Sequence, residues 1–293
     1  MARSWRDPSE QALARVLLAP AFALLALIVV YPVGRLLLTS LYDDSLTSGH
    51  AARFVGLENF QLVWEDPSFW SALINTLLIV LFTVPGAMVA GMLLALVANM
   101  PFRRKWPVRL ALLIPWALPL AFVGLIAGWF FQSDYGIVND VLRPFVSQKI
   151  IWFNSPTLSF AAMCMAIVWK TSSFVAMILL AGLQTIPADV YEAARVDGAS
   201  KWQQFWQVTL PLLRPSIVVA AIFRTITALQ TFDIPATMTR GGPGDATSTL
   251  AMYIHQTTVD FLDIGYGSAL AVVMFAISMV VSTIYLRNLR TGN

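Results

Sequence analysis

The chain contains apolar runs that are too long for a water-soluble fold. No charged residue occurs in the 36 residues between Asp66 and Arg103, and Val16–Gly34, Leu110–Ser133 and Ile264–Leu286 are also free of charge. A helix needs about 20 apolar residues to cross the hydrocarbon core of a bilayer. Only 12% of the 293 residues are charged, about half the share in soluble domains. These features disfavour an ordinary soluble enzyme, a disordered chain and a secreted disulfide scaffold.

Two further apolar runs carry charged residues: Lys170 interrupts one, and Arg224 and Asp233 interrupt the other. Backbone polar groups cannot stay unpaired in lipid, so the spans should be helices. The sequence therefore predicts an all-α polytopic membrane protein with six transmembrane helices, near 15–40, 70–99, 107–132, 158–184, 209–236 and 264–288. Prolines inside these spans should bend them locally; they are Pro32, Pro85, Pro115 and Pro119.

The distribution of lysine and arginine predicts the orientation. Positive residues favour the cytoplasmic side of a membrane. With the N-terminus inside, twelve of them face the cytoplasm: Arg3, Arg6, Arg15, Arg103, Arg104, Lys105, Arg109, Arg195, Lys201, Arg214, Arg287 and Arg290. Four lie in outer loops: Arg53, Arg143, Lys149 and Arg240. We therefore expect both termini in the cytoplasm, with the chain divided into an N-terminus (1–14), a first span with its outer loop (15–69), a core of five spans (70–288) and a C-terminus (289–293).

The residues required for common catalytic and cofactor sites are missing. The two histidines, His50 and His255, are expected in outer loops far apart in sequence, and one cysteine, Cys164, cannot form an intrachain disulfide. No lysine follows a glycine, so a phosphate-binding loop of the GxxxxGK type is absent. The sequence predicts a non-enzyme without a cofactor or metal of its own, and the net charge of +3 is too small to indicate nucleic-acid binding.

A polar segment at 187–211 predicts a helix–turn–helix on the cytoplasmic face. Pro187 suits a helix start, and Asp189 and Glu192 place acids early in that helix. Gly198 supplies a stop and a turn, and Ser200 can cap a second short helix. The small and charged exposed side suits insertion into a groove on a partner. The alternative from physics alone is an amphipathic loop that rests on lipid headgroups.

The same segment resembles a known family motif. Glu192-Ala193-Ala194, three residues, Gly198, nine residues and Val208-x-Leu210-Pro211 resemble the EAA loop in membrane-spanning subunits of binding-protein-dependent ABC importers, with Val208 where isoleucine is more usual. Further segments look like the carbohydrate branch of that family: Tyr31-Pro32, Val168-Trp169-Lys170-Thr171, Thr239-Arg240-Gly241-Gly242-Pro243 and Gly265-Tyr266-Gly267-Ser268-Ala269. The chain is most similar in type to the first permease of a sugar pair, as in MalF-like, UgpA-like and SugA-like subunits.

This resemblance implies a type I importer (MetI-like) permease fold in a bacterial or archaeal inner membrane. It implies a second homologous permease, two cytoplasmic ATPase subunits that bind ATP and Mg, an extracytoplasmic sugar-binding protein and a sugar substrate of the trehalose or maltose type. The EAA loop would couple to the ATPases through Glu192, Ala193, Ala194, Arg195, Asp197, Gly198, Leu210 and Pro211. Glu192→Lys or Gly198→Asp should then impair coupling or assembly without unfolding the spans.

Polar residues inside the spans indicate a substrate path. A charge at mid-bilayer costs at least about 2.5–3.5 kcal/mol on insertion scales, so it needs a partner or a wet cavity. We expect the path to be lined by Lys170, Thr171, Arg224, Thr227, Gln230 and Thr231. The alternative is that Lys170 and Arg224 pair with backbone carbonyls, or with acids of the partner permease, and only hold helices together.

Three other functions are alternatives to a sugar importer. A secondary transporter would use Lys170, Arg224 and Asp233 in an ion-coupled cycle. An intramembrane enzyme would need a nucleophile–base pair or a metal cluster, and neither is evident. An ABC permease for glycerol phosphate or another polyol-like solute would also suit two intramembrane cations.

Overall fold

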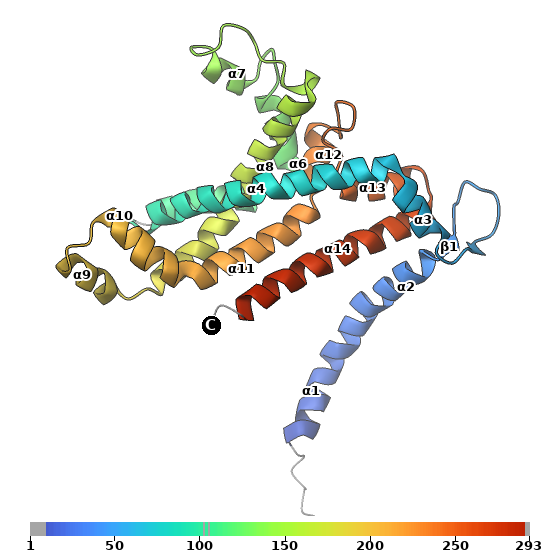
Figure 1. The fold of residues 1–293 in the computed structure, drawn as a ribbon, viewed down its shortest axis with the longest axis horizontal. Coiled ribbons are helices and arrows are strands. Elements are labelled where there is room, and N and C mark those ends of the chain that lie inside the picture. The colour runs from blue at the N-terminus through green and yellow to red at the C-terminus, as the bar shows by residue number, and fades with distance from the viewer. Residues whose placement is uncertain (1–9, 102, 105, 291–293) are drawn as a thin grey trace, which may run out of the picture. The chain divides into compact units, whose positions relative to one another are not determined.

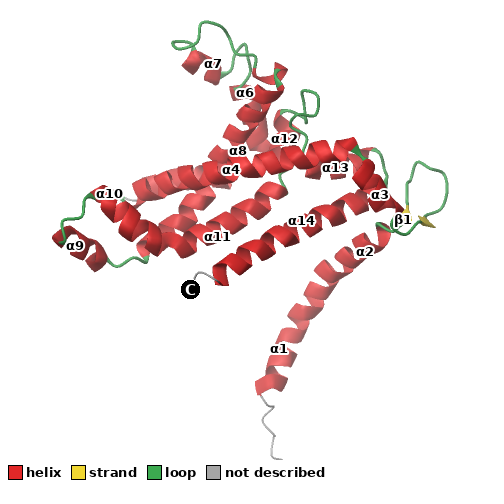
Figure 2. Cartoon of the chain, viewed as in Figure 1, coloured by secondary structure: helices red, strands yellow, loops and turns green. Residues whose placement is uncertain are grey.

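The computed structural model describes residues 10–101, 103–104 and 106–290, and side chains within 13–284. Of the cations used to predict the orientation, Arg3, Arg6 and Lys105 lie outside the described residues, as do the side chains of Arg287 and Arg290. Residues 1–9 of the predicted N-terminus and 291–293 of the predicted C-terminus also lie outside them. Helices make up nearly all of the regular structure (Figure 2), which confirms the predicted all-α class.

Among the described residues, five helical stretches are long and apolar enough to cross a membrane. The first joins α1 (Glu10–Leu25), a π-helical turn η1 (Ala26–Val30) and α2 (Tyr31–Thr39). The others are α4 (Pro67–Asn99), α8 (Pro156–Gln184), α10 (Lys201–Gln204) with η3 (Phe205–Thr209) and α11 (Leu210–Leu229), and α14 (Ile264–Arg290). A sixth span results if α5 (Trp106–Ala117) and α6 (Leu120–Phe130), which meet at 95°, cross as one broken helix.

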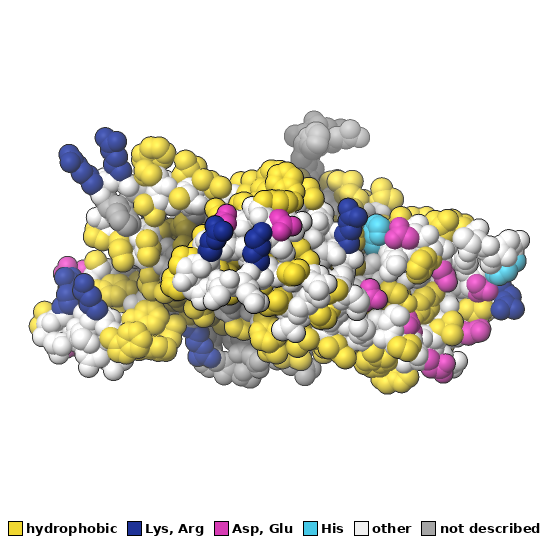
Figure 3. All heavy atoms as spheres, turned by 90° about the horizontal axis from the view of Figure 1, so that it is seen from above, with side chains coloured by type: hydrophobic (Ala, Val, Ile, Leu, Met, Phe, Trp, Pro, Cys, Tyr) yellow, Lys and Arg dark blue, Asp and Glu magenta, His cyan; other side chains and the backbone are white. Residues whose placement is uncertain are grey.

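Large hydrophobic side chains cover much of the molecular surface. Figure 3 shows one face on which hydrophobic side chains far outnumber charged ones. Neither η1 nor α2 buries any residue within this chain, and Val16, Phe22 and Ile28 are more than 60% exposed. A surface of this kind is stable against lipid or a partner subunit, not against water.

Proline decides where two of the spans break. Pro85 lies inside α4 without interrupting that helix, whereas the third span breaks between Ala117 and Leu120, beside Pro119. The predicted fifth span continued to residue 236, but α11 ends at Leu229 and a separate helix, α12 (Asp233–Met238), follows. Because Pro235 has no N–H, a continuous helix would leave the Thr231 carbonyl without its donor. The Thr249 hydroxyl supplies that hydrogen bond instead, at 2.7 Å.

The chain divides into two compact units, residues 1–65 with 254–273 and residues 66–253 with 274–293. The first unit contains α1, α2, the hairpin of β1 (Tyr42–Asp43) and β2 (Arg53–Phe54), and α3 (Glu58–Glu65). The Asn59 amide donates to the carbonyls of Ser40 and Tyr42, each at 2.9 Å, and fixes the chain after α2. A π-helical turn, η4 (Gln256–Asp260), precedes α14 in this unit.

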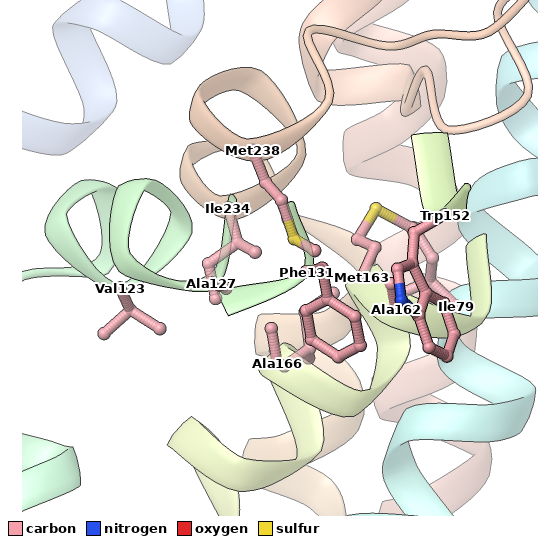
Figure 4. Close-up of a cluster of buried hydrophobic side chains, with 11 residues drawn as sticks. Ile79, Val123, Ala127, Phe131, Trp152, Ala162, Met163, Ala166, Ile234 and Met238 are labelled. Atoms are coloured by element: carbon pink, nitrogen blue, oxygen red, sulfur yellow. The ribbon is translucent and has the colours of Figure 1, made fainter. Parts of the chain in front are cut away.

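The second unit holds two hydrophobic clusters along α8. One joins α8 to α4 and α11 through small residues and leucines, including Ala87, Leu179 and Leu213. The other joins α8 to α6, α12 and the short 3-10 turn η2 (Trp152–Asn154). In Figure 4, Phe131 and Trp152 lie edge to face within this cluster, beside Met163 and Met238. The remaining short helices are α7 (Ile137–Leu142), α9 (Ala188–Val196) and α13 (Leu250–His255); their places are shown in Figure 1.

Candidate functional site

The 187–211 loop folds as the helix–turn–helix that the sequence predicts. Pro187 precedes α9, whose first turn contains Asp189 and whose last turn contains Arg195. Gly198 has φ +78°, a left-handed conformation that glycine adopts at low cost. Ser200 then caps α10: its hydroxyl accepts from the Gln203 N–H, and the Gln203 side chain accepts from the Ser200 N–H. The start of α9, the chain reversal at Gly198 and the start of α10 are thus each explained by a local residue, namely Pro187, Gly198 and Ser200.

The first helix of the loop is fixed at its base and exposed elsewhere. The Tyr191 hydroxyl lies 3.1 Å from the Thr209 hydroxyl, at the foot of α11, whereas α9 contains no buried residue. Glu192 and Arg195 form a surface ion pair at 3.7 Å, and Val196 is 87% exposed. Burying a valine side chain is worth about 1.5–3 kcal/mol. The α9 helix is therefore tied to the foot of α11 by one hydrogen bond and leaves the apolar side chain of Val196 uncovered beside charged residues.

The remaining predicted loop residues fall on the same structure. Ala193 is exposed and Ala194 is half-buried on α9, and Asp197 is its C-cap. Leu210 and Pro211 begin α11, at the junction of the loop with the span. Six of the eight predicted coupling residues thus lie on α9 or in the turn that follows it, and the other two, Leu210 and Pro211, lie at the start of α11.

A small cavity forms where α8, α11 and α12 meet. Its volume is about 90 Å³, room for a few water molecules. Its lining includes Thr171, Arg224, Thr227, Gln230 and Thr231, which are five of the six residues predicted for the substrate path. Asp233 and the apolar residues Leu120, Ile167, Phe232 and Ile234 complete the lining. Hydroxyl, amide and guanidinium groups therefore meet in one place, although Thr231 lies past the end of α11.

Arg224 is the central residue of this cavity. It is only 2% exposed; its guanidinium donates to the Thr83 hydroxyl on α4 at 2.7 Å and to the Thr227 hydroxyl at 3.3 Å. The Nε–H has no partner in the described structure. Sequence reasoning missed Thr83, because it lies 141 residues away and nothing local to either residue links the two.

Lys170 lies elsewhere and has a different set of contacts. It is 6% exposed, does not line the cavity, and its ammonium group donates to the carbonyls of Pro115 and Trp116, at 2.7 and 2.6 Å. In a continuous helix the Pro115 carbonyl would accept from residue 119, but Pro119 has no N–H. Lys170 supplies the missing donor and places its positive charge at the C-terminus of α5, where the helix dipole favours it.

The described residues contain no group of three or more histidine, cysteine, aspartate or glutamate side chains that could hold a metal ion. His255 ends α13, in the segment between the spans α11 and α14, and His50 lies in the loop between β1 and β2.

Comparisons with known proteins agree with this architecture. Residues 67–290 match the family described as "Binding-protein-dependent transport system inner membrane component". The chain is 63% identical over 287 residues to the sulfoquinovosyl glycerol transport system permease protein SmoG of Agrobacterium fabrum, covering 98% of this chain and 93% of that one. It is 34% identical over 278 residues to the trehalose/maltose transport system permease protein MalF of Thermococcus litoralis, covering 95% and 94%. A crystal structure of a bacterial alginate ABC transporter has a similar fold, with a TM-score of 0.82 and 20% identity over 97% of this chain and 96% of that one.

Proposed function

Because this chain belongs to the family of binding-protein-dependent transport system inner membrane components, we propose that it forms half of the translocation pathway of an ATP-driven importer. The chain is a non-catalytic, multi-pass permease subunit of a sugar ABC importer. The other half of the pathway is a second homologous permease, and an extracytoplasmic binding protein delivers the solute. The membrane is the inner membrane of the cell, with both termini in the cytoplasm, as the lysine and arginine distribution predicts.

The 187–211 loop is the segment by which this subunit couples to ATP hydrolysis. Two cytoplasmic ATPase subunits bind ATP and Mg, and one of them receives α9 in a surface groove. The support for this role is that Tyr191 ties α9 to the foot of α11, the Ser200 cap fixes the start of α10, and Val196 stays uncovered. A rigid helix held in a groove transmits movement, whereas a flexible segment would absorb it. Reversing two populations from 1:99 to 99:1 takes about 5.5 kcal/mol of differential binding, which ATP binding to the partner subunits must supply.

The substrate is a small glycoside, and the class of sulfoquinovosyl glycerol is favoured. The single observation that carries this choice is 63% identity to SmoG over nearly the whole of both chains. A neutral di- or oligosaccharide of the trehalose or maltose type is the second candidate, supported by 34% identity to MalF. The hydroxyl and amide groups around the Arg224 cavity suit the hydroxyls of either sugar.

Uptake by the reconstituted complex tests this function. The two permeases, the ATPase and the binding protein are placed in proteoliposomes that enclose ATP, with labelled sulfoquinovosyl glycerol or trehalose outside. We expect ATP-dependent accumulation of sulfoquinovosyl glycerol that persists when ionophores collapse all ion gradients. Loss of uptake with the gradients would instead support an ion-coupled transporter, and accumulation of trehalose alone would support the second candidate.

A matched pair of charge reversals tests the coupling role. Glu192→Lys places a like charge beside Arg195, 3.7 Å from the present carboxylate, and should lower ATP-driven uptake. Glu65→Lys reverses an exposed acid at the end of α3 and should leave uptake within about twofold. Equal effects of the two variants would remove the 187–211 loop from the coupling mechanism.

A further inference from the structure

Arg224 is a buried cation without an anion. No carboxylate of the described residues lies within 4 Å of its guanidinium, and its two partners, Thr83 and Thr227, are neutral hydroxyls. A guanidinium has five N–H donors, and the unpartnered Nε–H is the one buried side-chain polar atom left unsatisfied in the described structure. A buried charge is costly unless an opposite charge compensates it. Within the described part of the chain, the fold therefore maintains a cation here with no counter-ion beside it.

Hydrogen bonding between helices does not account for the charge. Arg224 on α11 donates a hydrogen bond to the Thr83 hydroxyl on α4. A neutral amide side chain could donate the same hydrogen bond without burying a charge. What only a cation provides is attraction for an anion, and arginine binds oxyanions with paired N–H groups. The spare donors therefore suit an oxyanion, and no carboxylate of the described residues lies within 4 Å to supply one.

The cavity limits where such an anion can sit. Asp233 is the one carboxylate among its lining residues and lies on α12. It repels an acidic group, so the acid must bind on the Arg224 side of the cavity, while Thr171, Gln230 and Thr231 remain for hydroxyls. The volume of about 90 Å³ admits a few waters but no sugar ring. A glycoside that passes this point therefore requires the cavity to widen.

We propose that Arg224 binds the acidic group of an anionic glycoside during its passage through the membrane, and so makes this subunit selective for sugars that carry an oxyanion. This inference rests on the proposed function, since it assumes that the cavity belongs to the solute path. In this proposal Arg224 binds the acidic group, and Thr83 positions the Arg224 guanidinium. The hydroxyls that line the cavity bind the sugar hydroxyls with less selectivity.

Three variants of the complete importer separate charge from structure. Arg224→Gln removes the charge and keeps hydrogen-bonding capacity; Arg224→Lys keeps the charge without paired donors; Thr83→Val removes the positioning bond. With sulfoquinovosyl glycerol as the probe at saturating binding protein, we expect uptake by Arg224→Gln to fall roughly 10- to 100-fold, as for loss of a charged hydrogen bond. Arg224→Lys should lose less than about tenfold and Thr83→Val less than about threefold, and the melting temperature of Arg224→Gln should not fall.

Several results would overturn the inference. Equal loss of uptake in all three variants would show that Arg224 only braces α4 against α11. Lower recovery of the permease pair with Arg224→Gln would show that an acid of the second permease is its partner. Unchanged uptake with Arg224→Gln would remove it from the path. A wild-type complex that imports trehalose but not the sulfonated glycoside would overturn the anion role while leaving the importer intact, and a complex that imports neither would overturn the proposed function as well.

Discussion

The two buried cations of the spans, Lys170 and Arg224, differ in what they contact. Lys170 donates to two carbonyls that a broken helix leaves free, and so completes the backbone hydrogen bonding of α5. Arg224 donates to two hydroxyls and retains an unpartnered donor beside a cavity. The sequence identified both residues and both possible roles, but the partners that distinguish the roles, Pro115, Trp116 and Thr83, lie 54 to 141 residues away. Residue type alone therefore could not assign the roles.

Removing the Lys170 amine should destabilise the broken third span. In Lys170→Met the carbonyls of Pro115 and Trp116 lose their donor, at a cost of about 1–3 kcal/mol for each unpaired group. Lys149→Met is the control, because Lys149 is exposed and makes only a surface contact with Asp134 at 3.4 Å, worth about 1 kcal/mol or less. Thermal unfolding of the purified complex should show a lower melting temperature for Lys170→Met alone. Similar melting temperatures for the two variants would contradict the bracing role.

The turn of the 187–211 loop should tolerate asparagine but not valine at Gly198. A left-handed conformation costs a non-glycine residue about 1–2 kcal/mol, least for asparagine and aspartate, and nothing lies within 4 Å of a Cβ at this position. Gly198→Val should therefore impair ATP-coupled uptake strongly and Gly198→Asn weakly. Gly198→Asp differs from Gly198→Asn by its charge, so any further loss measures the electrostatics of docking. If asparagine were as harmful as valine, crowding against a partner would be the cause, not backbone strain.

At the scale of helices, the length of the apolar runs predicted the spans well. The differences between predicted and observed spans occur where a proline interrupts helical hydrogen bonding. The predicted spans 70–99 and 158–184 lie within three residues of α4 and α8. The predicted span 209–236 was too long. Its apolar pattern continues past Pro235, but the helical backbone hydrogen bonds cannot continue there. Pro115 and Pro119 were expected to bend the third span, which breaks by 95° beside Pro119, and Lys170 of α8 donates to the carbonyls of Pro115 and Trp116 at this break. The local sequence thus predicts a bend in this span, whereas Lys170, which pairs with the carbonyls at the break, lies far away in the sequence.

Close packing of α4 against α8 depends on Gly91. A Cβ there would lie 2.6 Å from Val175 Cγ1 and 3.0 Å from the Ser172 carbonyl, so Gly91→Ala should cost about 1–3 kcal/mol by overpacking. Gly34 is the matched control, because it also lies in a helical span but has open space around it. Alanine at Gly34 should be neutral or slightly stabilising, since alanine is the better helix former. Thermal unfolding of both variants checks this, and a destabilised Gly34→Ala would contradict the packing argument.

At the scale of the whole molecule, the resemblance drawn from the EAA spacing is confirmed. The family matches residues 67–290, and relatives with sugar-transport names cover nearly the full chain. No motif in the sequence indicated the sulfonated glycoside proposed above as the substrate, because selectivity depends on a few side chains that one fold positions. The predicted trehalose or maltose type remains the second candidate.

The orientation in the membrane is a separate prediction. In a Cys164→Ala background, a single cysteine replaces Ser48 in the loop between β1 and β2, or Ala188 at the start of α9. A membrane-impermeant maleimide on intact spheroplasts should label the Ser48→Cys protein, and should label Ala188→Cys only after permeabilisation. The reverse labelling pattern would show that the protein has the opposite orientation in the membrane.

Photocrosslinking from Val196 tests whether an ATPase subunit holds the 187–211 loop. A photoreactive amino acid replaces Val196, which is 87% exposed on α9, in the complete importer in native membranes. The same amino acid at Val141, 64% exposed on α7, is the control. We predict a crosslink to the ATPase subunit from position 196 and none from position 141. Crosslinks from position 196 to lipid alone, or equal ATPase crosslinking from both positions, would show that the ATPase subunit does not hold this loop.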